Sequence, residues 1–178
     1  MKNDPFAFTK HEYSENQRLA LTFLAGLLFV VAIPVALIRL ARQDRSKHIP
    51  LSRPLQIGTR LGSAILLSMG WPLALWTVVD QFIRGRGTPV PVMATQELLV
   101  DGPYRLCRNP MALGTILAYL GLALWRGAQR TILTVIFGAA ILLLYIKLIE
   151  EKEMEARFGQ AYLNYKLSTP FLVPHLRQ

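Results

Sequence analysis

The sequence predicts an all-α, polytopic membrane protein with about four transmembrane helices and a C-terminal amphipathic helix at the membrane surface. Of its 178 residues, 52% are hydrophobic and only 17% are charged. The apolar residues are gathered into long runs, as membrane-spanning segments require. We therefore expect residues 1–178 to form one membrane-embedded domain, and any chemistry to sit at a membrane face.

The first two apolar runs, residues 19–38 and 61–79, contain no charged residue. Each matches the roughly 20 helical residues that cross a hydrocarbon core. Pro34 lies inside the first run and predicts a kink that neighbouring helices must tolerate. Residues 39–60 are basic and carry Pro50 and Pro54, which should prevent a regular helix throughout, so we expect them to form an interfacial loop.

The third and fourth runs, residues 110–125 and 131–149, are joined by a connection so short that they must form an antiparallel hairpin. Gly114, Ala118 and Gly121 recur at helical spacing on one face of the third run. Small residues at this spacing allow helices in a membrane to approach closely. Packing is the simpler interpretation of this face, and a ligand role is the alternative.

The net charge of +9 points to anionic lipid headgroups, because the Lys and Arg residues cluster between the apolar runs. Nucleic acid is therefore not expected as a partner. The single cysteine, Cys107, excludes an intramolecular disulfide and any multi-cysteine metal site. His11, His48 and His175 do not share a metal-ligand spacing on one helix face, so we expect no metal.

Residues 85–109 are expected to form a loop of defined conformation at the membrane surface. Asp101-Gly102-Pro103 has the composition of a turn. Asn109-Pro110 is typical of a helix start, because Asn is a favoured N-cap and Pro a favoured first helical residue. Gly85-Arg86-Gly87 is a lone Gly-x-Gly, which is more often a turn than a ligand cradle.

The last segment, residues 150–167, is predicted to be the amphipathic helix. At 100° per residue, one stripe holds its apolar and aromatic side chains, namely Met154, Phe158, Ala161, Tyr162 and Tyr165. Glu150 and Glu151 lie along this stripe, whereas Glu153 and Glu155 lie to its two sides. The alternative is that these glutamates only carry the helix out of the bilayer, since acidic residues are common where a span meets water.

Two blocks of short motifs carry a family resemblance. The first is Gly102-Pro103-Tyr104 with Arg108-Asn109-Pro110-Met111, and the second combines Glu150-Glu151, Phe158-Gly159, Tyr162, Tyr165 and Pro174. Their order and spacing resemble the isoprenylcysteine carboxyl methyltransferase and phospholipid methyltransferase family of integral membrane enzymes. The likeness extends weakly to Gly87-Thr88-Pro89. It implies methyl transfer from S-adenosyl-L-methionine to a lipid or lipid-modified acceptor.

The resemblance also implies which residues form the site. The cofactor contacts would be Leu98, Leu99, Tyr104, Asn109, Pro110, Met111, Glu150 and Glu151. We expect Arg108 and Asn109 to be the catalytic residues, with Arg108 as an electrostatic anchor for a carboxylate. No further catalytic group is required, because in-line methyl transfer depends mainly on aligning the donor with the nucleophile and on excluding water. Asn109 stands where the isoprenylcysteine branch usually has His, and Ala112 stands where a Tyr is common. The methyl acceptor is therefore left open between a prenylated thiol, a prenylated carboxylate and an amine headgroup.

Other classes of protein fit the sequence less well. Transport is disfavoured because the four runs contain no charged residue before Lys147. An NADPH-dependent, sterol-reductase-like membrane enzyme is an alternative, although no Gly-x-Gly-x-x-Gly fingerprint is present. A non-catalytic membrane interaction protein is another. The oligomeric state is left open.

The methyl donor also determines the expected orientation. S-adenosyl-L-methionine is made in the cytosol and is too polar to cross a membrane freely. We therefore expect a multi-pass protein of the bacterial inner membrane whose active site, termini and C-terminal helix face the cytosol. Positive charge alone does not decide the orientation, because both sides carry many Lys and Arg residues.

Overall fold

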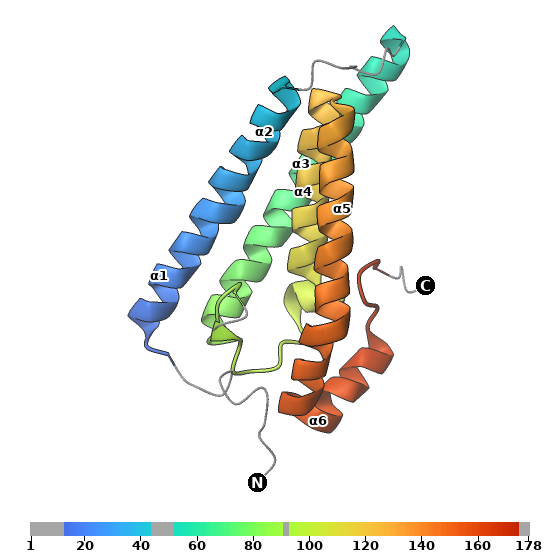
Figure 1. The fold of residues 1–178 in the computed structure, drawn as a ribbon. Coiled ribbons are helices and arrows are strands. Elements are labelled where there is room, and N and C mark those ends of the chain that lie inside the picture. The colour runs from blue at the N-terminus through green and yellow to red at the C-terminus, as the bar shows by residue number, and fades with distance from the viewer. Residues whose placement is uncertain (1–12, 44–51, 91–92, 175–178) are drawn as a thin grey trace.

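The computed structural model describes residues 13–43, 52–90 and 93–174, and these contain helices and loops but no strand (Figure 1). The N-terminal rod comprises α1 (Glu15–Gly26), the π-helix η2 (Leu27–Ala32) and α2 (Ile33–Gln43). It is followed by α3 (Arg53–Ile83), the short 3-10 helix η4 (Gly102–Arg105) and α4 (Pro110–Arg126). The C-terminal rod comprises α5 (Gln129–Tyr145), the π-helix η5 (Ile146–Glu150) and α6 (Glu151–Ser168).

The prediction of an all-α membrane protein is confirmed. Three helical rods, Glu15–Gln43, Arg53–Ile83 and Gln129–Ser168, are long and apolar enough to cross a membrane, with mean hydropathies of 2.7, 1.5 and 2.5. The fourth predicted span is α4, an apolar helix of 17 residues. Large apolar side chains on the outside of the bundle, such as Phe23 at 66% and Phe137 at 70% exposed, would face lipid.

The expected basic loop over residues 39–60 is wrong in its bounds. Helix α2 continues to Gln43, and α3 begins at Arg53 rather than near residue 61. Pro54 lies in the first turn of α3, where its missing N–H would have no partner in any case, so it starts the helix instead of ending one. Pro50 and His48 lie outside the described residues, as do His11 and His175.

Pro34 produces a change of helical register in the N-terminal rod. In η2 the amide of Ile33 donates to the carbonyl of Leu28, five residues back. In the same π-helical pattern the next residue, Pro34, would donate to the carbonyl of Phe29. Proline has no N–H, so this hydrogen bond is missing. The hydroxyl of Tyr119 on α4 donates to that carbonyl at 2.6 Å. At the predicted kink there is thus a π-helical stretch, in which the side chain of a neighbouring helix supplies the missing hydrogen-bond donor.

The core of the bundle is the close contact of α3 and α4. A Cβ atom added at Gly70 would lie 2.5 Å from the backbone nitrogen of Ala118, and one added at Gly114 would lie 2.6 Å from that of Ala74. The predicted small face of the third run therefore packs directly against the backbone of α3. This contact fixes the end of α3 against the start of α4.

The loops that carry the sequence motifs gather at one end of the bundle (Figure 1). The start of α1, the end of α3, the loop between α3 and α4, and α6 all lie there, whereas the turn between α4 and α5 lies at the other end. Arg18 on α1 donates to the carbonyl of Phe82 on α3 at 3.0 Å, which ties two of these elements together.

Candidate functional site

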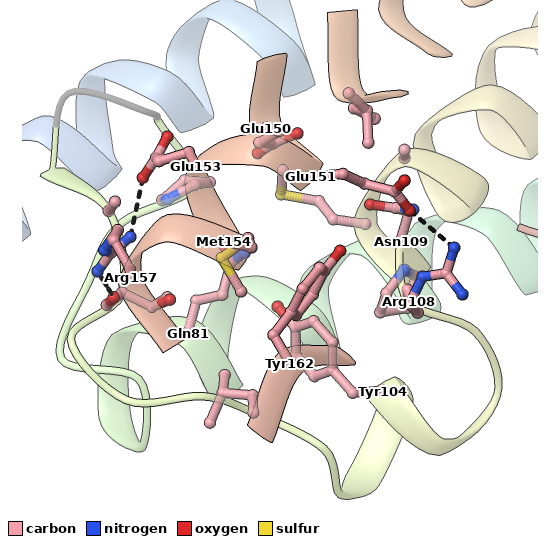
Figure 2. A pocket seen from close by; sticks show the side chains of 18 of the residues that line it. Gln81, Tyr104, Arg108, Asn109, Glu150, Glu151, Glu153, Met154, Arg157 and Tyr162 are labelled. Carbon is pink, nitrogen blue, oxygen red and sulfur yellow. Dashed lines mark hydrogen bonds and ion pairs between the residues drawn. The ribbon is translucent and has the colours of Figure 1, made fainter. Parts of the chain in front are cut away.

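A cavity lies between the end of α3, the loop that follows it, the start of α4 and the turn from η5 into α6 (Figure 2). It encloses about 900 Å³ of empty space, part of which is open to solvent. Both sequence blocks contribute to its walls.

The first part of the loop is shaped by the Gly-x-Gly motif. A Cβ atom added at Gly87 would lie 2.5 Å from Cα of Thr95, and one added at Gly85 would lie 2.8 Å from its Cγ2. The amide of Gln96 donates to the carbonyl of Gly85 at 2.7 Å. The two glycines thus let the loop fold back on itself, so the turn interpretation of this motif accounts for them.

Tyr104 is carried into the cavity by η4. Gly102 has a φ of 60°, which a glycine adopts without strain, and Pro103 is buried. Burial raises the pKa of the Tyr104 phenol, and the carboxylates of Asp80 and Glu150 act in the same direction. The phenol therefore stays protonated and can donate a hydrogen bond.

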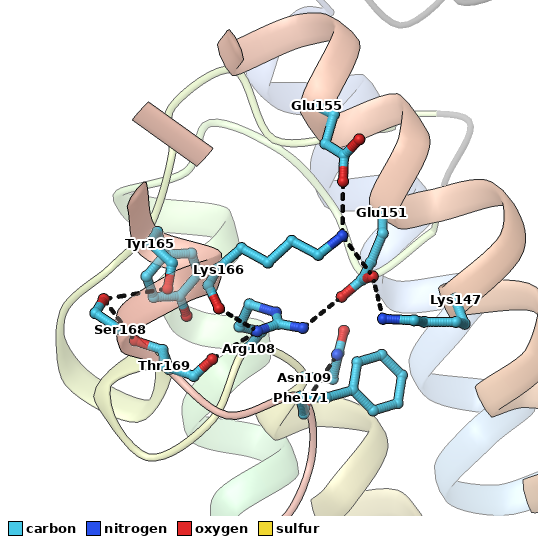
Figure 3. A network of polar contacts seen from close by, with 10 residues as sticks. All are labelled: Arg108, Asn109, Lys147, Glu151, Glu155, Tyr165, Lys166, Ser168, Thr169 and Phe171. Atoms are coloured by element: carbon cyan, nitrogen blue, oxygen red, sulfur yellow. Dashed lines mark hydrogen bonds and ion pairs between the residues drawn. The ribbon is translucent and has the colours of Figure 1, made fainter. Parts of the chain in front are cut away.

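Arg108 is the centre of a polar network that joins the loop to the C-terminal segment (Figure 3). Its guanidinium donates to the carbonyls of Lys166 at 2.8 Å and Thr169 at 2.6 Å. It also pairs with Oε1 of Glu151 at 2.7 Å, and the two side chains are only 7% and 3% exposed. Most of its donors are therefore already used within the protein.

The backbone of Arg108 and the side chain of Asn109 hold the residues after α6. The amide of Arg108 donates to the carbonyl of Pro170 at 2.8 Å. The side-chain amide of Asn109 donates to the carbonyl of Phe171 at 2.9 Å. The Phe171 ring lies under two cations, 5.8 Å from Arg108 and 5.2 Å from Lys147. Arg108 and Asn109 thus fasten the C-terminal segment to the start of α4.

Glu150 and Glu151 have opposite surroundings. Glu151 accepts from Lys147 at 2.8 Å and pairs with Lys166 at 3.2 Å, in addition to Arg108. Glu150 lines the cavity and makes no hydrogen bond or ion pair with another described residue. Its carboxylate is therefore the acidic group at the cavity wall that is available to a ligand.

Glu153 and Arg157 form a second buried ion pair at the cavity wall. Their side chains are each 6% exposed and lie 2.9 Å apart, and Arg157 also donates to the carbonyl of Thr95. Glu153 was expected beside the buried stripe, but its side chain is buried. The spacing of four residues between Glu and Arg on one helix is the signal that could have identified the pair.

The helical stripe predicted for residues 150–167 is correct only in part. Gly159 has φ 53° and ψ −128°, which is not helical and breaks the regular 100° progression. Ala161 is exposed, contrary to the prediction, while Tyr162 and Tyr165 are buried. The hydroxyl of Tyr165 donates to the carbonyl of Tyr104 at 2.7 Å, which ties α6 to η4.

Most of the residues expected at the site meet at this cavity. The expected residues in its wall are Leu99, Tyr104, Arg108, Asn109, Pro110, Met111, Glu150 and Glu151. Leu98 is not in the wall. Residues that the sequence analysis did not assign to the site include Gln81, Thr95, Glu153, Met154 and Arg157.

The chemistry of the wall suits a ligand with a cationic part and an apolar part. Glu150 offers a carboxylate that has no partner among the described residues, and Tyr104 and Tyr162 offer aromatic surfaces to a cation. Leu99 and Met111 supply apolar surface nearby. Among the described residues no group of three or more His, Cys, Asp or Glu side chains could hold a metal ion.

Comparison with known proteins gives matches at the level of family and of individual relatives. The model of the phospholipid methyltransferase family matches residues 59–161. The chain is 30% identical over 139 residues to a methanethiol S-methyltransferase of Pseudomonas deceptionensis, covering 69% of this chain and 50% of that protein. It is 29% identical over 105 residues to methanethiol S-methyltransferase 2 of Bradyrhizobium diazoefficiens, covering 57% of this chain and 37% of that protein. The matched part thus spans half or less of these relatives, and no solved structure matches the chain.

Proposed function

Because the chain belongs to the phospholipid methyltransferase family, we propose that it is an S-adenosyl-L-methionine-dependent methyltransferase whose methyl donor binds in the cavity beside Glu150. The observation that carries the proposal is the carboxylate of Glu150, which lines the cavity and has no partner among the described residues. Glu150 is half-buried, and a ligand that donates hydrogen bonds to its carboxylate offsets the cost of removing that group from water.

The other wall residues are assigned roles by their chemistry. Tyr104 and Tyr162 present aromatic surface to positive charge, and Leu99 and Met111 give the adenine an apolar slot. When bound, S-adenosyl-L-methionine would supply a methyl group on a sulfonium: the acceptor nucleophile bonds to the methyl carbon as the carbon–sulfur bond breaks in line, and the neutral thioether S-adenosyl-L-homocysteine leaves. The protein's share of the work is to align the two reactants and exclude water.

Arg108 and Asn109 act as positioning residues in this proposal rather than as groups that touch the reacting atoms. Their side chains hold the carbonyls of Lys166, Thr169 and Phe171. The C-terminal segment is thereby kept against the start of α4, next to the cavity. Glu151 contributes through the same network, since it pairs with Arg108 and Lys147.

The site faces the cytosol in this proposal, in a bacterial inner membrane. The cavity lies at the end of the bundle where α1 starts and α3 ends, and a cytosolic donor must be able to reach it (Figure 1). The start of α1, the loop between α3 and α4, and α6 would then lie on the cytosolic side.

The proposed acceptor is a lipid or lipid-modified molecule that enters from the bilayer. Met111, Ala112 and Ile146 give the cavity an apolar wall where α4 begins and α5 ends. A second candidate is a small thiol, which is favoured by the names of both relatives, methanethiol S-methyltransferases. The two acceptors share a need for apolar surface but differ in how much of it they bury.

A series of alkyl thiols that differ only in chain length, assayed in mixed micelles, separates the two. Each buried methylene contributes about 0.8 kcal/mol, so kcat/KM for a lipid acceptor should rise about fourfold per methylene until the cavity is filled. Equal or better turnover of methanethiol would favour the small thiol. Absence of transfer to any thiol and to a total lipid extract, in a protein that is folded in detergent, would contradict the methyltransferase proposal.

A further inference from the structure

The side chain of Gln81, in the last turn of α3, brings an unpaired hydrogen-bond acceptor to the wall of the cavity (Figure 2). Its Oε1 atom is buried and accepts no hydrogen bond from any residue that the structure describes. A buried carbonyl oxygen without a donor is rare in folded proteins, because the hydrogen bonds that it loses to water are not replaced. The roles assigned above to the wall residues do not use this atom.

The orientation of the Gln81 amide is set by Tyr104. Burial raises the pKa of the Tyr104 phenol, and a hydrogen bond from the Gln81 side chain acts against this rise. A hydrogen bond that lowers the pKa of a phenol is donated to its oxygen, and only the amide nitrogen of a glutamine side chain can donate. Nε2 of Gln81 therefore faces the phenol, and Oε1 is the end of the amide that is left for a ligand.

The backbone at Gln81 is held by the Gly-x-Gly turn. The amide of Gly87 donates to the carbonyl of Gln81 at 3.0 Å, and the amide of Gly85 donates to the carbonyl of Asp80 at 3.1 Å. The carboxylate of Asp80 pairs with Arg84 at the end of the same helix. Gln81 thus extends into the cavity wall from a helix end whose backbone is fixed by hydrogen bonds to the following loop.

The loop after α3, which folds back onto Gln81 through Gly87, gives the cavity an apolar surface. Four apolar side chains of this loop line the cavity, namely Pro89, Val90, Ala94 and Leu99. The hydroxyl of Thr88 is directed to the carbonyls of Val90 and Met93, each at 3.2 Å. Arg157, which donates to the carbonyl of Thr95 in this loop, is already paired with Glu153. A ligand part that lies here therefore meets apolar surface together with the neutral acceptor of Gln81.

We propose that Gln81 determines specificity for the base of the methyl donor, by accepting a hydrogen bond from the exocyclic amino group of adenine. This inference rests on the proposed function and adds a residue that recognises one part of the donor. The ammonium and sulfonium of S-adenosyl-L-methionine have a stronger partner in the carboxylate of Glu150. The base is flat and carries a neutral amino group, so it matches an apolar surface with a neutral acceptor.

The experiment is equilibrium binding, in detergent, of two ligands that differ only in this amino group. One is S-adenosyl-L-homocysteine, and the other is its analogue with unsubstituted purine in place of adenine. The wild type should bind the analogue about tenfold more weakly, because the buried acceptor is then left unpaired. This comparison needs no variant.

Gln81→Met tests whether Gln81 is the residue responsible, since methionine has a similar length and no amide oxygen. It should bind S-adenosyl-L-homocysteine about fivefold more weakly than the wild type and discriminate between the two ligands by only about twofold. Gln160→Met is the matched control, because Gln160 is exposed, donates to Asn164 at 2.9 Å and does not line the cavity. Its affinities for both ligands should equal those of the wild type.

Two results would overturn this inference while leaving the proposed function intact. Equal affinity of the wild type for the two ligands would show that the amino group is not recognised. An equal loss of both ligands in Gln81→Met, with the wild-type discrimination retained, would show that Gln81 contacts another part of the donor. Absence of saturable binding of either ligand by the folded wild type would instead contradict the proposed function, and this inference with it.

Discussion

Glu150 and Glu151 are adjacent in sequence. Glu150 lines the cavity without a partner in the part of the chain that the structure describes, whereas Glu151 is held by Arg108, Lys147 and Lys166. The family resemblance implied that both are cofactor ligands, and the sequence places both along one helical stripe. It could not separate them, because Arg108 lies 43 residues away from Glu151 and its approach depends on the tertiary fold. The structure therefore concentrates the proposed ligand role on Glu150.

Glu150→Gln should weaken binding of S-adenosyl-L-methionine by about tenfold or more, since a hydrogen bond to a charged group contributes roughly 1.5–3 kcal/mol. Glu155→Gln is the matched control, because Glu155 pairs with Lys166 and does not line the cavity. Isothermal titration calorimetry in detergent measures both. Normal binding by Glu150→Gln together with weak binding by Glu155→Gln would refute the assignment.

At the scale of elements, the N-terminal rod makes a hydrogen bond to α4 that its own sequence does not predict. Pro34 predicts a kink, but only the structure shows that Tyr119 on α4 closes the carbonyl of Phe29 at 2.6 Å. Similarly, the helical stripe predicted for residues 150–167 loses its regular progression at Gly159, whose positive φ is not visible to a periodicity analysis. Local patterns thus predicted the helices and most site residues, whereas register changes and side-chain partners needed the packed fold.

A double-mutant cycle tests the π-helical contact. Tyr119→Phe should lower the free energy of unfolding by about 0.5–1.5 kcal/mol, because the Phe29 carbonyl loses its donor. In a Pro34→Ala background the same change should be nearly neutral, since an alanine, unlike proline, has a backbone N–H to donate. Thermal unfolding in detergent, followed by tryptophan fluorescence, gives the four stabilities. Additive effects would mean that the two residues do not share the carbonyl.

The contact of α3 with α4 makes a second prediction at this scale. Gly114→Ala would place Cβ 2.6 Å from the backbone of Ala74, so the helices must separate, at a cost of about 1–3 kcal/mol. Gly138→Ala on α5 is the control, because nothing lies within 4 Å of an added Cβ there. Its unfolding temperature should stay equal or rise, as helix propensity favours Ala. Equal losses in both variants would show that the Gly114 contact is not tight.

For the whole molecule, the arrangement of the helices predicts which loops share a side of the membrane. The native Cys107 is buried, and burial raises the pKa of its thiol, so it should react poorly with maleimides. Asp101→Cys and Gln129→Cys place new thiols at the two ends of the bundle. In intact bacteria a membrane-impermeant maleimide should label Gln129→Cys but label Asp101→Cys only after lysis. The reverse pattern would contradict a cytosolic site.

The sequence predicted the helical membrane fold well, because long uncharged runs leave few other structures in a bilayer. It also predicted the pairing of the loop with the last helix, through motifs about forty residues apart. It did not predict that Arg108 and Asn109 hold the C-terminal segment, since their partners are backbone carbonyls, which carry no sequence signal. The boundaries near Pro54 were missed because a proline starts a helix as readily as it ends one.

The most direct measurement is equilibrium binding of S-adenosyl-L-methionine by the purified protein in detergent, compared with NADPH under the same conditions. A methyltransferase with its donor beside Glu150 should bind S-adenosyl-L-methionine saturably at one site per chain, and NADPH should neither bind saturably nor compete. Saturable binding of NADPH without binding of S-adenosyl-L-methionine would contradict the account and indicate a reductase. Binding of neither ligand by the folded protein would contradict it as well, and would favour a non-catalytic membrane protein.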